Sequence, residues 1–116
     1  MPIGLWRAML ALCMAVVLVL SLLPASSNLP TTGWDKSNHA LAFMALAFIS
    51  HWAWPGRTVS AAAGLLTYGG LIEVLQSLTP SRSAEFGDLI ADGVGLLMGT
   101  LLARVLARWM SRRQHP

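Results

Sequence analysis

The sequence predicts an all-α membrane protein, a bundle of four transmembrane helices with both termini in the cytoplasm. Three observations favour this fold class: the composition, four apolar stretches of membrane-spanning length, and an uneven distribution of basic residues. The 116 residues are 55% hydrophobic and 11% charged, whereas soluble domains contain about 45–50% apolar and about 25% charged residues. Too little polar surface remains to cover a small water-soluble domain, and a disordered chain would contain fewer apolar residues. We therefore expect one membrane domain over residues 1–116.

The first predicted helix covers residues 3–23 and carries one charge, Arg7, near its beginning. Its length suffices, because a helix needs about 20 residues to cross the hydrocarbon region. Pro24 and the small polar residues that follow it end the stretch. A cleavable signal peptide is the alternative for this segment, since residues 25–27 (Ala-Ser-Ser) supply the small residues of a cleavage site. The apolar run is long for such a peptide, which favours a helix that stays in the protein.

The other three predicted helices cover residues 35–54, 59–78 and 88–110. Helix-breaking residues separate them, because Pro55-Gly56 follows the second stretch and Thr79-Pro80 follows the third. Each stretch is again about as long as the hydrocarbon region requires. The pattern therefore predicts four spans joined by short connections.

The basic residues predict the orientation, because Lys and Arg are enriched in cytoplasmic loops. With the N-terminus inside, only Lys36 and Arg82 lie on the outer side. The six on the cytoplasmic side are Arg7, Arg57, Arg104, Arg108, Arg112 and Arg113. Both termini are therefore expected in the cytoplasm. We interpret the basic C-terminus as membrane-flanking and expect no nucleic-acid partner, since no patch of basic residues interleaved with aromatics occurs elsewhere.

All five acidic residues fall on the predicted outer side, together with other polar residues. A helical rise of 1.5 Å per residue places His39, Glu73 and Asp92 about 6–8 Å below the outer helix ends. Ionisable groups at such depth pair with one another or face a polar cavity. We therefore predict one ligand-binding cluster at the outer face. It comprises Asp35, Lys36, His39, Glu73, Gln76, Arg82, Asp88 and Asp92.

Small residues accompany the acids on the same helix faces. Asp88, Asp92, Gly95 and Gly99 occur at i, i+4, i+7 and i+11, which is one face of a helix. The two glycines form a small-xxx-small pair that permits close approach of a second helix in a membrane. We expect this face to pack against another helix.

The polar residues follow a fixed order and spacing: Asp35-Lys36-x-x-His39-x-x-x-Phe43, Glu73-x-x-Gln76, Arg82 and Asp88-x-x-x-Asp92-x-x-Gly95-x-x-x-Gly99. This pattern, over roughly residues 34–99, resembles the VanZ-like family of small bacterial membrane proteins. Asp92 departs from it, since Asn is more usual there. The resemblance implies a location in the bacterial inner membrane and a role in the cell envelope, because the family's named member is associated with low-level resistance to teicoplanin. It implies no particular reaction.

Three classes of function fit these residues. The first is a binding or resistance module that engages a lipid-linked wall precursor or a glycopeptide, with Lys36 and Arg82 contacting phosphate. The second is an enzyme that acts on a lipid head group, with His39, Glu73 and Asp92 as catalytic candidates. The third is a structural or assembly partner in which the polar residues only hold the helices together.

We expect membrane lipids as partners, with no cofactor and no metal. The single cysteine, Cys13, allows neither an internal disulfide nor a cysteine-based metal site. His39 is the one histidine near the acids, and a lone histidine without a compact ligand motif is weak evidence for a metal.

Overall fold

The computed structural model describes residues 2–22, 35–78 and 86–114, with the side chains of residues 35–37, 86 and 114 left out. This part of the chain is all-helical, as predicted. It contains four α-helices in the order α1 (Ile3–Leu22), α2 (Asp35–Ala53), α3 (Thr58–Ser77) and α4 (Phe86–Gln114).

The turn between α2 and α3 lies where Pro55 and Gly56 predicted it. Gly56 has φ +77°, in the left-handed region that glycine adopts without steric cost. The backbone N–H of Arg57 donates a hydrogen bond to the carbonyl oxygen of Trp54 at 3.2 Å, which closes the turn. The chain thereby reverses direction within a few residues.

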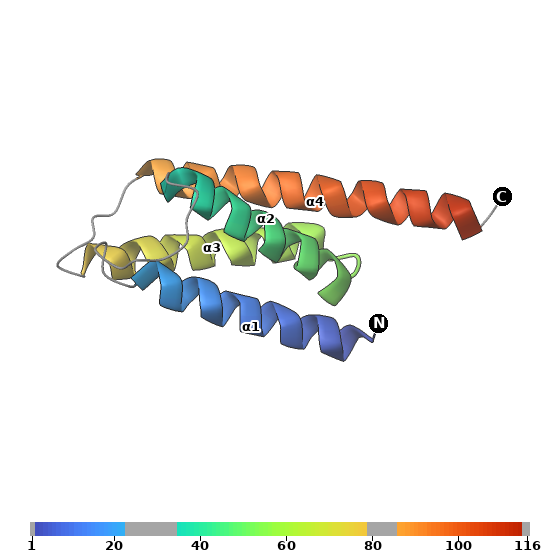
Figure 1. Ribbon diagram of the computed structural model, residues 1–116, viewed down its shortest axis with the longest axis horizontal. Helices are drawn as coiled ribbons and strands as arrows, with labels where there is room; N and C mark the ends of the chain where they lie inside the picture. Colours follow the sequence, from blue (N-terminus) through green and yellow to red (C-terminus); the bar gives the residue numbers. More distant parts are fainter. Residues whose placement is uncertain (1, 23–34, 79–85, 115–116) are drawn as a thin grey trace.

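Helix α4 is longer than predicted. The apolar run ends near Met110, but the helix continues to Gln114, because arginine and glutamine favour a helix whether or not lipid surrounds them. Its 29 residues extend about 43 Å at 1.5 Å per residue, more than the roughly 30 Å of a hydrocarbon core. Figure 1 shows the C-terminal part of α4 projecting beyond the other helices.

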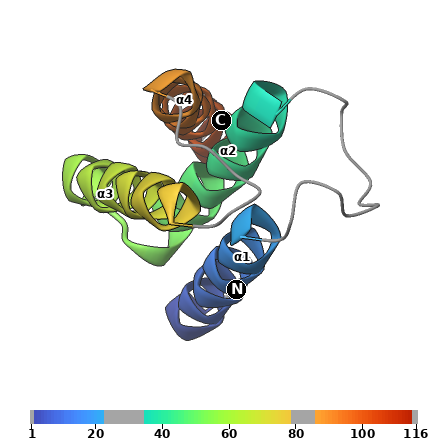
Figure 2. The ribbon, with the colours of Figure 1, turned by 90° about the vertical axis from the view of Figure 1, so that its left-hand side faces the viewer.

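Helix α2 is the centre of the bundle. It contacts each of the other three helices, most extensively α4, whereas the described part of α1 contacts α2 and α3 but not α4. The beginning of α1 and the end of α4 lie at one end of the bundle (Figure 1). At the opposite end, which faces the viewer in Figure 2, α3 ends and α2 and α4 begin. Residues far apart in the sequence therefore meet at that end.

Three of the four helices, α1, α3 and residues 87–113 of α4, are long and apolar enough to cross a membrane. Helix α2 is less apolar, because Asp35, Lys36, Asn38 and His39 occupy its first five residues. Large apolar side chains such as Leu12, Val59, Leu71, Leu97 and Val105 are exposed on the outside of the bundle. An outer surface of this kind is typical of a protein that faces another apolar phase.

The backbones of α2 and α4 touch at two glycines. A Cβ on Gly95 would collide with the carbonyl oxygen of Ala40, and a Cβ on Gly99 would collide with that of Met44. The prediction that this glycine face packs against another helix is therefore confirmed. The contact also brings the first turns of both helices together.

The N-terminal half of α1 is attached to the end of α2. Arg7 donates a hydrogen bond from Nε to the carbonyl oxygen of Ala53 at 3.0 Å, and its guanidinium lies 3.7 Å from the ring centroid of Trp54. The rings of Trp6 and Trp52 stack with centroids 6.0 Å apart. Aromatic and basic side chains therefore gather at the end that carries the termini.

Hydrogen bonds join α3 to α1 along the rest of its length. The Tyr68 hydroxyl donates to the carbonyl oxygen of Met14, and Gln76 Nε2 donates to that of Ser21 at 2.8 Å. Side chains of α3 supply the donors and backbone carbonyls of α1 supply the acceptors. No side-chain pattern in the sequence reports such contacts.

Candidate functional site

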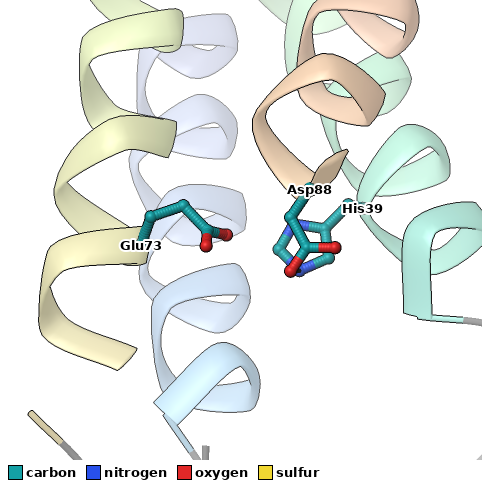
Figure 3. A group of neighbouring side chains, drawn as sticks. All are labelled: His39, Glu73 and Asp88. Atoms are coloured by element: carbon teal, nitrogen blue, oxygen red, sulfur yellow. Dashed lines mark ion pairs between the residues drawn. The ribbon is translucent and has the colours of Figure 1, made fainter. Parts of the chain in front are cut away.

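Four of the predicted site residues converge at the end of the bundle opposite the termini. We call them the polar cluster: His39 from α2, Glu73 from α3, and Asp88 and Asp92 from α4. One ligand atom each from His39, Glu73 and Asp88 can be chosen so that all three lie within 4.8 Å of one another. In Figure 3 the Glu73 carboxylate points from α3 across to Asp88 and His39.

The His39 ring lies between the two aspartates of α4. Its Nδ1 is 3.0 Å from Asp92 Oδ1, a hydrogen bond, and its Nε2 is 3.9 Å from Asp88 Oδ2. An ionised carboxylate accepts hydrogen bonds and does not donate them, so when Asp92 is ionised the proton of this bond belongs to Nδ1. In the neutral ring, Nε2 then carries a lone pair that faces the side of Asp88.

The carboxylates of the polar cluster are buried. The exposed fraction is 0% for Asp92, 6% for Asp88 and 8% for Glu73. Removing ionised carboxylates from water costs several kcal/mol each unless charges or hydrogen bonds compensate. Compensating contacts are therefore part of the cluster, and the hydrogen bond between His39 and Asp92 is one of them.

Two further residues shape the polar cluster. Gly69 lies one turn before Glu73, and a Cβ at this position would stand 2.6 Å from Asp92 Oδ2 and 3.1 Å from Phe43 Cζ. Phe43, one turn after His39, is fully buried. The absence of a side chain at Gly69 therefore lets the Asp92 carboxylate approach α3. Gly69 and Glu73 are four residues apart and share a helix face, but this spacing alone does not indicate the contact with Asp92.

The structure gives the remaining predicted residues different places. Gln76 is 2% exposed, and its bond to Ser21 joins the end of α3 to the end of α1. The side chains of Asp35 and Lys36 lie outside the described residues, as does Arg82. Their predicted roles in ligand binding stay predictions, as do those of the polar cluster.

The arrangement supports two kinds of chemistry. An imidazole held by a carboxylate can take up or release a proton at its second nitrogen, as in general acid–base catalysis. An imidazole nitrogen beside two carboxylates can also hold a cation, and His39, Glu73 and Asp88 are the described residues placed to do so. Both depend on the same nitrogen, Nε2.

A family model described as VanZ/LLP1 matches residues 5–107 of the chain. The matched range includes all of α2 and α3, most of α1 and α4, and the complete polar cluster. No curated protein and no solved structure matches.

Proposed function

This chain belongs to the VanZ/LLP1 family, and we propose that it is a four-helix protein of the bacterial inner membrane whose polar cluster binds the head group of a lipid-linked cell-envelope precursor. The observation that carries the proposal is the convergence of His39, Glu73 and Asp88 from three helices at one end of an otherwise apolar bundle. Ionisable groups within membrane segments mark ligand sites by default, because their burial is costly.

The proposal includes α2 as a fourth span. Its polar first turn lies at a bundle end, where head groups and water reach it, and its remaining length is packed against all three other helices. An even number of spans agrees with the position of the beginning of α1 and the end of α4 at one end of the bundle (Figure 1). Arg7, Arg57 and the arginines of α4 belong to that same end, which makes it the cytoplasmic side under the positive-inside rule. The polar cluster then lies at the outer end of the bundle.

A lipid-linked precursor suits this position and these groups. Its hydrocarbon tail would contact the apolar outside of the helices, while its polar head would reach the bundle end. Carboxylates accept hydrogen bonds from sugar hydroxyls and amides, and Lys36 and Arg82 remain the proposed contacts for phosphate. Resistance to a glycopeptide would follow if bound precursor were withheld from the drug.

Binding of a labelled polyprenyl diphosphate disaccharide to the purified protein in lipid nanodiscs tests the proposal. Glu73→Gln should lower the affinity at least about tenfold, because a hydrogen bond to a charged group contributes about 1.5–3 kcal/mol. Thr67→Val is the matched control on α3, since the exposed Thr67 hydroxyl donates to Ala63 of its own helix. No binding by the wild type, or equal binding by both variants, would contradict the proposal. Labelled teicoplanin in the same assay tests direct glycopeptide binding, and binding of the drug without the lipid would also contradict it.

The hydrogen bond between His39 and Asp92 favours a second candidate, an enzyme that acts on the same head group. A carboxylate that holds Nδ1 orients the imidazole and stabilises its protonated form, which suits Nε2 for proton transfer. Formation of a cleaved product from the labelled lipid, lost in His39→Gln while the lipid still binds, would support catalysis. Recovery of unchanged lipid after prolonged incubation would exclude it for this substrate.

A further inference from the structure

We propose that the polar cluster binds one divalent cation, with His39 Nε2, Glu73 and Asp88 as ligands and Asp92 as the residue that orients His39. The inference goes beyond the proposed function, because it does not depend on which head group the protein binds. It rests on the positions of four side chains that three different helices bring together.

The spacing of the three ligand atoms suits a cation after a small movement. They lie within 4.8 Å of one another, whereas neighbouring ligands of one cation are about 3–3.5 Å apart, given bond lengths of about 2.0–2.3 Å. The Glu73 side chain already points toward the other two (Figure 3). Since His39 Nε2 and Asp88 Oδ2 are 3.9 Å apart, side-chain rotations of both Glu73 and Asp88 would have to bring the ligand atoms closer.

The hydrogen bond of His39 is the one that a metal-binding histidine usually makes. Histidine ligands generally donate their second ring N–H to a carboxylate or carbonyl, which fixes the ring and leaves the other nitrogen for the metal. Asp92 Oδ1 accepts from Nδ1 at 3.0 Å, and Nε2 is the nitrogen that faces Asp88. Asp92 is 0% exposed, so it is held in place by the packing around it. Its other oxygen, Oδ2, has no hydrogen-bond partner among the described residues and lies beside Gly69.

The residue types of the polar cluster are also compatible with a cation. His39 lies among three buried carboxylates, those of Glu73, Asp88 and Asp92. A bound divalent ion is often the largest local charge in such a site and offsets repulsion between the acids. It would also give an anionic phosphate head group a positive partner at the cluster.

The ligand set points to Mn²⁺ among the common divalent ions. Closed structural zinc sites use four cysteine or histidine ligands, and Mg²⁺ prefers oxygen ligands throughout. One imidazole and two carboxylates suit a six-coordinate ion that accepts both nitrogen and oxygen and keeps positions open for water or phosphate. The sequence alone predicted no metal, because His39, Glu73 and Asp88 belong to no compact ligand motif.

Titration of Mn²⁺ into the full chain tests the proposal, with the protein in nanodiscs after treatment with a chelator. Calorimetry should find one saturable site per chain, and Glu73→Gln and Asp88→Asn should each weaken binding at least about tenfold. Asp92→Ala should weaken it about 10- to 100-fold, whereas Asp92→Asn should change it little, because an amide oxygen still accepts from Nδ1–H. His51→Ala, at the other end of α2, is the control and should bind like the wild type.

Electron spin echo spectroscopy of the bound Mn²⁺ gives a readout on the wild type itself, which should show coupling to an imidazole nitrogen. His51→Ala should retain this coupling, and His39→Gln should lose it. The proposal is overturned by the absence of this coupling in the wild type. Binding no tighter than about 1 mM, the weak end for protein cation sites, would also overturn it, as would equal affinity in Glu73→Gln and the wild type.

Discussion

Replacing glycine by alanine along α4 should have opposite effects at neighbouring positions. At Gly93, where an added Cβ meets nothing within 4 Å, alanine should stabilise the helix by up to about 1 kcal/mol through its higher helix propensity. At Gly95 the added Cβ would collide with the carbonyl oxygen of Ala40. Since that neighbour is backbone, no side-chain rotation relieves the clash, and α2 and α4 have to separate by roughly 1 Å to restore contact distance.

The magnitude follows from the two opposing terms. Overpacking costs about 1–3 kcal/mol or more where the backbone must shift, which equals or exceeds the gain in propensity of about 1 kcal/mol. The free energy of unfolding of Gly95→Ala should therefore be lower than that of the wild type by up to about 2 kcal/mol, and lower than that of Gly93→Ala by about 1 kcal/mol more. Gly99→Ala should behave like Gly95→Ala, because its Cβ would collide with the Met44 carbonyl oxygen. The double variant should not be additive, since one separation of the two helices relieves both clashes.

Unfolding by sodium dodecyl sulfate, followed by circular dichroism in mixed micelles, measures these differences. Separation of α2 from α4 also pulls His39 away from Asp92, so Gly95→Ala should weaken Mn²⁺ binding while Gly93→Ala leaves it unchanged. Equal stability of Gly95→Ala and Gly93→Ala would refute the backbone contact. A destabilised Gly95→Ala with normal Mn²⁺ affinity would refute the link between this contact and the polar cluster.

Three further predictions concern the polar cluster, α1 and the orientation. Gly69→Ala should displace the Asp92 carboxylate, because the new Cβ would stand 2.6 Å from Asp92 Oδ2, and should weaken Mn²⁺ binding by at least about tenfold. Gly70→Ala is the control, since its Cβ meets nothing within 4 Å. Equal Mn²⁺ affinities of the two variants would contradict the contact. Tyr68→Phe should lower the free energy of unfolding by about 0.5–1.5 kcal/mol, because the bond to Met14 is lost, and an unchanged denaturation midpoint would count against that bond. Reporter fusions should lie outside, inside, outside and inside in turn, and a periplasmic C-terminus would refute the orientation. The fusion points are Pro30, Arg57, Ser83 and Pro116.

Much of the fold could be predicted because the rules that govern it are local. Apolar runs of helical length, interrupted by residues such as Pro55 and Gly56, predicted four helices whose bounds agree with the structure to within a few residues. The spacing of Gly95 and Gly99 indicated a face for close helix contact, and the glycines do contact another helix. These features depend only on the length of each apolar run and on the spacing of residues along one helix, and both can be read directly from a sequence.

The composition of the polar cluster was partly predictable for the same reason. Equal depth along three helices placed His39, Glu73 and Asp92 at one level, since the rise per residue is constant. Depth does not specify which side chains touch. No sequence pattern indicated that Gln76 bonds to a carbonyl oxygen of α1, because backbone acceptors are present at every residue and only packing selects one.

The sequence by itself determined that this chain is a helical membrane protein, which polar residues lie at the same end of it, and to which family it belongs. Only the tertiary structure decided that Asp92 is hydrogen-bonded to Nδ1 of His39 while Nε2 faces Asp88. It also decided that Gly69, which has no side chain, leaves room for the Asp92 carboxylate. The physical reason is that a helix's residues share one periodicity, whereas its rotation about its own axis is set by contacts with its neighbours. Here the backbone contact of α2 with α4 sets that rotation. It thereby decides that Nε2 of His39 is the ring nitrogen left for a proton or a cation.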